Sequence, residues 1–285
     1  MVAKVSRRRA GAAGTDNRAM GIPVDLSLRW PSAAALQAPW WQPYRALLAA
    51  WPPPGLAPGA AVADGLNALA AAQGDVPVRF VGQQALPEGQ AYEAFIRARR
   101  QVPTRDNAHD LFNGLVWLRL PRTKRRLNAL QAGEIQRAGV GARRGPVRDA
   151  CTVFDENAAL LHAPDALWQA LAQRRWAELF GPLRPLWGQA SLLVFGHAAL
   201  EKLLSPYKSI TAHVWRVALP FDAAGDLAAL DAWLAADLTP DKLARKPFVP
   251  LPLLGVPGWW PANQAPTFYD DVEVFRPLRG TATPG

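Results

Sequence analysis

The chain has 285 residues, half of them hydrophobic, and a formal net charge of +9 from 32 Lys and Arg against 23 Asp and Glu. This length and apolar content suffice for one large domain or two small ones with a buried core, which excludes a wholly disordered protein. The single cysteine, Cys151, excludes an internal disulfide and cysteine-based zinc motifs. It also favours a reducing compartment, so we expect a cytoplasmic protein.

The chain begins with a basic segment that we expect to be disordered. Residues 1–19 are rich in Arg and Ala and lack the apolar core of a secretory signal. Met20 directly precedes the first hydrophobic run and is an alternative to Met1 as the start of translation. We expect residues 20–285 to form a single globular domain. No run of 18 or more apolar residues occurs, so no transmembrane helix is expected.

Hydrophobic spacing and helix-breaking residues predict a mainly helical domain. Helices are predicted over residues 32–51, 61–72, 90–100, 106–120, 121–138, 164–180, 189–204 and 226–238. Strands are predicted at 78–81 and 214–219, where short apolar runs contain β-branched residues. Residues 151–162 fit either a hairpin around Asp155-Glu156-Asn157 or a helix.

The end of the chain predicts irregular but ordered structure. From residue 247 to 285, frequent prolines and the pair Trp259-Trp260 predict a segment without regular elements that packs over the body. The fold class is therefore α+β, predominantly helical with a few short strands, in a single compact domain.

The helix predicted over residues 106–120 has an unusual polar face. At about 100° per residue, one arc holds Asp106, His109, Asp110, Asn113 and Trp117, while leucines face the other way. An ordinary solvated face is rich in Lys, Glu and Gln. The residue types found here bind ligands or make buried hydrogen bonds, so this face predicts either a ligand site or a structural polar network between helices.

Positive charge is concentrated in residues 95–148, which contain thirteen Lys and Arg against three acidic residues. Such a basic lobe attracts an anionic partner, such as a nucleic acid, a phosphorylated metabolite or an acidic membrane face, unless it is only a solvated surface. Pro121 predicts a helix start whose free amide groups favour an anion. We predict Arg105, Lys124 and Arg125 as the anion contacts. An acidic side chain such as Asp110 or Asp149 is the alternative occupant.

Two histidines and nearby carboxylates are the candidate catalytic residues. His197 and Glu201 are separated by four positions, which places both on one helix face, where the carboxylate would orient the imidazole or share a metal. With His109 and Asp110, and with Asp155 and Glu156 as further candidates, they would form a set able to bind a divalent metal or perform general acid/base chemistry. The alternative is structural, with His197 buried and satisfied by Glu201 or a backbone carbonyl. The surrounding polar network is predicted to comprise Asp106, Asn113, Asn128, Asp149, Asp155 and Glu156.

Several motifs of this chain resemble a known family. They are the run from Arg105 through His109-Asp110-Leu111-Phe112-Asn113, then Trp117, Pro121-Arg122-Thr123-Lys124 and Asn128, followed by Arg148-Asp149-Ala150, Phe154-Asp155-Glu156-Asn157, Phe195-Gly196-His197-Ala198 and the tail from Leu254 to Pro277. Over about residues 26–280 the chain is similar to an uncharacterised bacterial family, domain-of-unknown-function family 3025. A bulky aromatic residue is common in that family where this chain has Ala108. The resemblance implies no known activity.

Three functions follow as hypotheses. The first is an enzyme or ligand-binding protein for a small anionic compound, which a phosphorylated metabolite would satisfy. The second is a nucleic-acid-associated protein that uses the basic lobe from Arg97 to Arg148. The third is a non-catalytic interaction protein in which the polar face is only a structural network.

Overall fold

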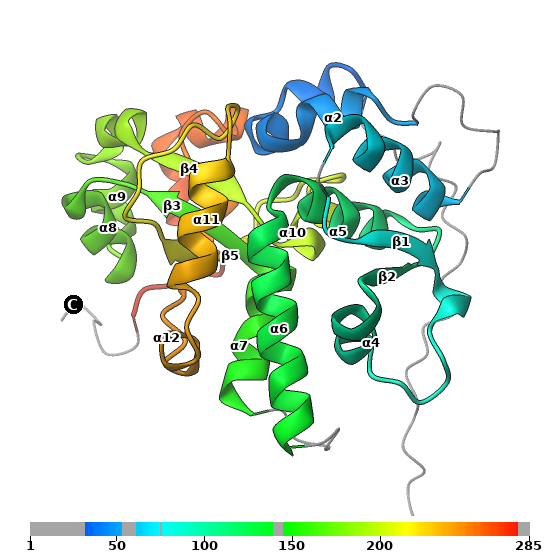
Figure 1. Cartoon of the computed structure of the whole chain (residues 1–285). Coiled ribbons are helices and arrows are strands. Elements are labelled where there is room, and N and C mark those ends of the chain that lie inside the picture. The colour runs from blue at the N-terminus through cyan, green and yellow to red at the C-terminus, as the bar shows by residue number, and fades with distance from the viewer. Residues whose placement is uncertain (1–31, 53–60, 75, 139–144, 279–285) are drawn as a thin grey trace, which may run out of the picture.

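The fold is centred on a four-stranded mixed sheet in the order β4-β3-β5-β6 (Figure 1). A computed structural model describes residues 32–52, 61–74, 76–138 and 145–278. The central strand β3 pairs with β4 in the antiparallel sense and with β5 in the parallel sense, while β6 is antiparallel to β5. The strands are β3 (Ala158–His162), β4 (Ser191–Val194), β5 (Thr211–Arg216) and β6 (Val249–Pro252). Residues 158–161 are fully buried, as expected for a strand covered on both faces.

Helices surround this sheet and supply most of the core. They are α2 (Arg45–Ala49), α3 (Val62–Gln73), α4 (Tyr92–Arg99), α5 (Ala108–Arg119), α6 (Pro121–Ala138), α7 (Pro146–Asn157), α8 (Asp165–Ala172), α9 (Trp176–Phe180), α10 (His197–Lys202), α11 (Ala228–Asp237) and α12 (Pro240–Ala244). A second, parallel sheet of two strands, β1 (Arg79–Gly82) and β2 (Gln101–Thr104), is connected through α4. None of the helices in the described part of the chain is both long and apolar enough to cross a membrane.

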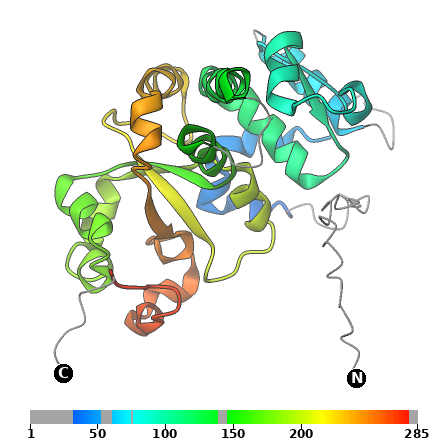
Figure 2. The same cartoon turned by 90° about the horizontal axis from the view of Figure 1, so that it is seen from below.

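Three consecutive helices, α5, α6 and α7, meet α10 beside the large sheet and position the candidate site. Helix α5 packs against α10, α6 packs against α7, and α7 packs against α10. Helix α4 covers α6 on the side away from the large sheet, as Figure 1 shows. Seen from below, the C-terminal segment lies beside α8 and α9 and far from α4 (Figure 2). The site is therefore built by the helical half of the molecule.

Helix α7 resolves the alternative that the sequence left open for residues 151–162. Residues 146–157 form a helix, and β3 follows at once, so the predicted hairpin is wrong. The buried residues of α7 are Val147, Ala150, Cys151 and Phe154, which recur at helical spacing. Pro146 is the first helical residue, where its missing N–H costs no hydrogen bond.

The helix predicted over residues 189–204 is wrong in its first half. Residues 191–194 form β4, the edge strand beside β3, and the helix begins only at His197. The turn between them is tight, because the amides of Phe195 and Gly196 both donate to the carbonyl of Ala158 at 2.9 Å. The sequence pattern alone does not distinguish a short apolar strand from buried helix.

Other elements differ from the prediction at their ends or in their continuity. Residues 32–51 form short 3₁₀ turns before α2 instead of one helix, and the helix predicted over 164–180 is divided into α8 and α9. Arg174 has a positive φ of 52° at that division, which a continuous helix does not allow. The strand β2 was not predicted, and β6 forms within the segment from residue 247 that was expected to contain no regular elements. The predicted class, α+β and mainly helical in one compact domain, is confirmed, whereas the predicted extension 1–19 and the alternative start at Met20 lie outside the described residues.

Candidate functional site

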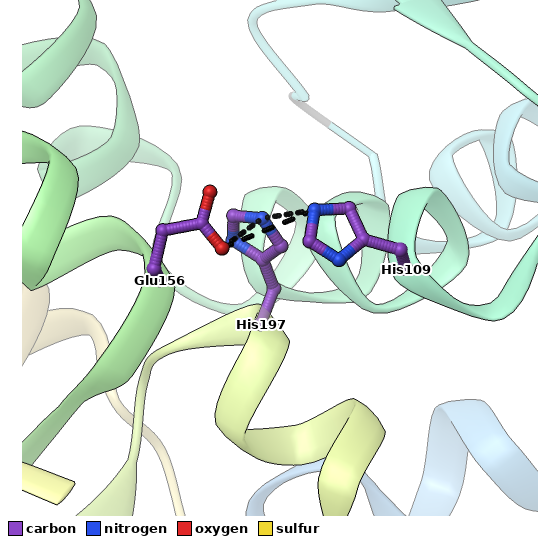
Figure 3. A group of neighbouring side chains, drawn as sticks. All are labelled: His109, Glu156 and His197. Atoms are coloured by element: carbon purple, nitrogen blue, oxygen red, sulfur yellow. Dashed lines mark hydrogen bonds and ion pairs between the residues drawn. The ribbon is translucent and has the colours of Figure 1, made fainter. Parts of the chain in front are cut away.

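Three side chains from three helices place one ligand atom each around a common point (Figure 3). The Nε2 atoms of His109 on α5 and His197 on α10 are 3.0 Å apart. The carboxylate of Glu156 on α7 lies 3.5 Å from His197 Nε2 and 3.9 Å from His109 Nε2. We call these three residues the His109–Glu156–His197 cluster. It is the group of His, Cys, Asp or Glu side chains in the described residues whose arrangement fits a metal ion.

The local sequence at the start of α5 explains the position of His109. The side chain of Asn107 caps the helix by accepting the amide of Asp110 at 2.8 Å. Helix α5 therefore starts at Ala108, not at Asp106 as predicted, and His109 falls in its first turn. Asp106 lies outside the helix and accepts the amide of Val62 at 2.8 Å, which ties α5 to the start of α3.

Gly196 explains how His197 comes so close to Glu156. A Cβ atom at Gly196 would lie 2.4 Å from the amide nitrogen of Asn157 and 2.5 Å from the carbonyl carbon of Glu156. Only glycine allows the two backbones to approach this closely. His197 is the first residue of α10, so the close approach holds its ring against the end of α7.

Carboxylates also lie near Nδ1 of both imidazoles, the ring nitrogen that does not take part in the cluster. Glu201, one turn after His197, places Oε2 2.9 Å from Nδ1 of His109. The predicted partnership of Glu201 with His197 is therefore replaced by one with the other histidine. Asp155 Oδ2 lies 3.7 Å from Nδ1 of His197, which is buried and has no hydrogen-bond partner among the described residues. Metal-bound histidines commonly have a carboxylate at this outer nitrogen, because it fixes the tautomer and the ring orientation.

A buried lysine holds Asp155 in place. Lys124 is 4% exposed, and its Nζ donates to Asp155 Oδ1 at 2.5 Å and to Asn113 Oδ1 at 2.7 Å. It also lies 5.6 Å from the centre of the Trp117 ring. With two hydrogen-bond partners and an aromatic face around it, this ammonium group is satisfied inside the protein.

The electrostatic environment shifts the pKa values of the two histidines in opposite directions. The hydrogen bond that His109 donates to the Glu201 carboxylate raises the pKa of His109, whereas burial lowers the pKa of His197 to about 4. Burial raises the pKa of Glu156 and opposes the ionisation of Asp155, but the ammonium of Lys124 outweighs it and keeps the pKa of Asp155 low. These pKa shifts favour a neutral His197 whose Nε2 accepts a hydrogen bond from Nε2–H of His109.

The His109–Glu156–His197 cluster matches the geometry of a transition-metal site. Ligand atoms bound about 2.1 Å from one ion lie roughly 3.0–3.5 Å from one another at angles of about 90–110°. Two of the three distances, 3.0 and 3.5 Å, fall in this range, and the third is 3.9 Å. Two neutral imidazoles and one carboxylate suit zinc or non-haem iron(II). An ion at this point would replace the proton shared by the two rings and compensate the charge of the half-buried Glu156.

The cluster opens into a cavity of about 510 Å³, a size typical of small-molecule sites. Its walls come from α4, α5, α6, α7 and α10 and from the segment before α4. The polar residues that line it include Tyr92, Glu93, Arg105, Asp110, Asn113, Gln131, Arg148 and Thr152, together with the cluster and Asp155. A bound molecule could therefore reach the metal-binding atoms and a charged wall at once.

Residues 78–279 match the model of a family described as "Protein of unknown function (DUF3025)". The chain belongs to this family. The matched range covers more than two thirds of the chain and contains the whole cluster with Lys124, Asp155 and Glu201. No curated protein and no solved structure matches the chain. Membership of DUF3025 brings no activity with it, so the chemistry must come from the geometry of the site.

The anion site predicted at the start of α6 is filled by the protein itself. The carboxylate of Asp231 on α11 accepts the amides of Arg122 and Thr123, both at 2.8 Å, and the hydroxyl of Thr123 at 2.7 Å. Asp231 is 3% exposed. An acidic partner does occupy this helix end, but it is neither Asp110 nor Asp149.

The predicted anion contacts and network residues lie in different places. Arg105 forms two hydrogen bonds with Asp110, at 2.9 and 3.1 Å, and lines the cavity, while Arg125 is exposed and outside it. Asn128 donates to the backbone and carboxylate oxygens of Glu93. Asp149 pairs with Lys246, away from the cavity.

Sequence reasoning singled out Asp155 and Glu156 of α7 but missed Arg148 and Thr152 of the same helix. Arg148, Thr152, Asp155 and Glu156 line the cavity at helical spacing. Recognising residues 146–157 as a helix would have shown that these side chains share a face. Tyr92 and Glu93, which come from the first turn of α4, had no sequence signal that linked them to His109.

Proposed function

We propose that this protein is a divalent-metal-dependent enzyme that acts on a small anionic compound bound in the 510 Å³ cavity. The observation that carries the proposal is the convergence of His109 Nε2, His197 Nε2 and the carboxylate of Glu156 within 3.0–3.9 Å. The elements that supply them are far apart in the sequence.

The carboxylates beside the Nδ1 atoms of the two histidines favour a metal centre rather than a structural polar network. A structural histidine is satisfied by one or two hydrogen bonds, but Nδ1 of His197 is buried and forms no hydrogen bond with any described residue, and its Nε2 points at another imidazole. Bound metal would hold Nε2, and a small rotation would bring Nδ1–H onto Asp155. Glu201 already performs this outer role for His109.

Three protein ligands leave coordination positions open for water or substrate. An ion bound there would lower the pKa of a water molecule or polarise a substrate oxygen. Two imidazoles with one carboxylate occur in zinc hydrolases and in iron(II) oxygenases. The identity of the ion would therefore decide between hydrolysis and oxidation.

Metal binding by the purified full-length chain tests the proposal. Stripped protein is dialysed against Zn²⁺, Mn²⁺ or, without oxygen, Fe²⁺, and bound metal is measured by mass spectrometry and calorimetry. We expect about one ion per chain, a bound ion that raises the Tm, and loss of binding in His197→Ala and Glu156→Gln. Glu201→Gln should weaken binding by about 10–100-fold, the usual effect of removing an outer carboxylate.

The matched control is His162→Ala, which removes a half-buried histidine at the far end of β3 whose Nδ1 hydrogen-bonds the carbonyl of Val217 and which does not line the cavity. It should bind metal as the wild type does. Absence of stoichiometric metal in the wild type, or equal binding by His162→Ala and His197→Ala, would overturn the proposal. If His197→Ala then lowered the Tm without any ligand effect, the cluster would be a structural network.

A further inference from the structure

The basic side chains at the cavity differ in whether the protein already neutralises them. Arg105 is paired with Asp110 through two nitrogens, and its backbone amide donates to the same carboxylate at 2.6 Å. Lys124, which does not line this cavity, is buried and donates to Asp155 and Asn113. The positive charge of each is therefore already paired with a carboxylate, although Arg105 keeps further N–H groups that make no hydrogen bond.

Arg148 is the exception on the cavity wall. Its side chain makes no hydrogen bond and no ion pair with any described residue, and its Nε is buried without a partner. Arg119 also has an unpartnered Nε, but its Nη2 donates to the carbonyl of Gly225 at 3.0 Å and it lies outside the cavity. A guanidinium group left unpaired at a cavity wall is costly unless a ligand completes it.

The nearby carboxyl of Glu93 does not take this role. It accepts Asn128 Nδ2 at 2.5 Å, and burial raises its pKa to about 7 although Arg148 lowers it. No ion pair within 4.0 Å joins Glu93 to Arg148 in the described residues. Arg148 therefore keeps its positive charge available at the wall.

The position of Arg148 relative to the cluster follows from α7. Arg148 and Glu156 are eight residues apart on one helix, which corresponds to a rise of about 12 Å, or a little over two turns. Thr152 and Asp155 lie between them and also face the cavity. The wall of α7 thus runs from a free guanidinium group at one end to the metal-binding carboxylate at the other.

We propose that Arg148 binds an oxyanion, the phosphate or carboxylate group of a ligand whose other end reaches the His109–Glu156–His197 cluster. The second half of this inference rests on the proposed metal centre, whereas the first half does not. It assigns the substrate class as an elongated organic anion whose charged group is remote from the reacting group. The planar fork of arginine suits two-point binding of either oxyanion.

Anion binding to the metal-free protein tests Arg148 separately from the metal centre. Inorganic phosphate and acetate are titrated in turn into stripped protein at low ionic strength, followed by calorimetry, so that the two oxyanion types are compared. We expect saturable binding by wild type of at least one of them and at least tenfold weaker binding by Arg148→Gln. Arg148→Lys, which keeps the charge without the fork, should fall between them.

The control is Arg125→Gln, which removes the same charge from an exposed arginine of the same basic segment and should bind as wild type does. Circular dichroism and Tm verify that each variant is folded. Equal weakening by Arg148→Gln and Arg125→Gln, or no saturable binding of either anion to wild type, would overturn the inference.

A double comparison distinguishes failure of this inference from failure of the metal centre. His197→Ala should lose metal but keep the anion affinity of metal-free wild type, whereas Arg148→Gln should keep metal and lose the anion. If His197→Ala reduces anion binding to metal-free protein as much as Arg148→Gln does, the anion lies at the histidines and the assignment of Arg148 is wrong.

Discussion

At the scale of single residues, the site depends on groups whose protonation is set by their neighbours. His109 and His197 touch, yet the carboxylate of Glu201 raises the pKa of the first and burial lowers the pKa of the second. A pair of identical side chains is thereby made unequal. The pair therefore includes one neutral imidazole, His197, whose Nε2 lone pair points at His109 and would bind a metal ion once that ion replaced the shared proton.

Glu93 gives a prediction about pH and stability that does not depend on any ligand. Burial raises its pKa from 4.5 to about 7, so the folded state binds its proton more tightly than the unfolded chain does. The stabilisation is complete below the unfolded pKa and is lost as the pH rises from about 4.5 to about 7. Glu93→Gln keeps a neutral group of the same shape that still accepts from Asn128.

We therefore expect Glu93→Gln to raise the Tm by a few degrees at pH 8 and to change it little at pH 5. Thermal unfolding of wild type and variant at both pH values measures this difference. Glu88→Gln, at an exposed position before α4, serves as the control and should shift the Tm equally at both values. A Glu93→Gln protein less stable than wild type at pH 8 would contradict the burial argument.

At the scale of elements, the contact between the α7–β3 junction and the turn before α10 controls the cluster. Gly196→Ala would place a methyl group 2.4–2.5 Å from backbone atoms of Asn157 and Glu156, which cannot rotate away. Overpacking of this kind costs about 1–3 kcal/mol of folding free energy. The variant should also bind metal more weakly, since α10 must move away from Glu156 to relieve the clash.

The comparison for Gly196→Ala is Gly133→Ala, a glycine inside α6 whose added Cβ would meet no atom within 4 Å. Alanine should stabilise that helix by about 0.5–1 kcal/mol and leave metal affinity unchanged. Urea unfolding and metal titration measure both effects. If Gly196→Ala matched Gly133→Ala, the close approach would not position His197.

The elements that the sequence predicted well are those with a local signal. Pro121 and the helical spacing that follows it predicted α6 from its first residue to its last, and the polar face of α5 correctly singled out His109. The predicted hairpin at residues 151–162 failed because two to three turns of helix and a short strand have similar apolar content. That error hid the shared face of α7 that places Arg148 on the same cavity wall as Glu156.

Some hydrogen-bond partners in and around the site could not be predicted from any local sequence pattern. Glu201 is one turn from His197 in the sequence but bonds His109 on another helix, and Asp231 reaches the start of α6 from more than a hundred residues away. Both depend on how helices pack. Spacing identifies which residues share a face, but tertiary packing decides which face they meet.

At the scale of the whole molecule, only some of the basic side chains of residues 95–148 are left unpaired on the surface of the folded protein. Part of that charge is paired within the protein: Lys124 is buried against Asp155, and Arg105, although exposed, pairs with Asp110. Arg148 faces the cavity. The exposed remainder includes Arg97, Arg99, Arg100, Arg122 and Arg125. A polyanion would therefore contact less exposed positive charge than the net charge of +9 suggests.

This distribution leads to a prediction about nucleic acid. Each phosphate neutralised by Lys or Arg adds about 0.9 to the slope of the logarithm of affinity against the logarithm of salt, so a few exposed arginines give only weak, salt-sensitive binding. We expect weak retention of labelled duplex DNA at about 50 mM salt and none at about 200 mM, measured by fluorescence anisotropy. Arg125→Gln should lower the low-salt affinity, whereas Arg148→Gln should not, because its charge lies inside the cavity. Tight binding that persists at the higher salt and depends on the exposed arginines would instead favour the nucleic-acid-associated function over the enzyme.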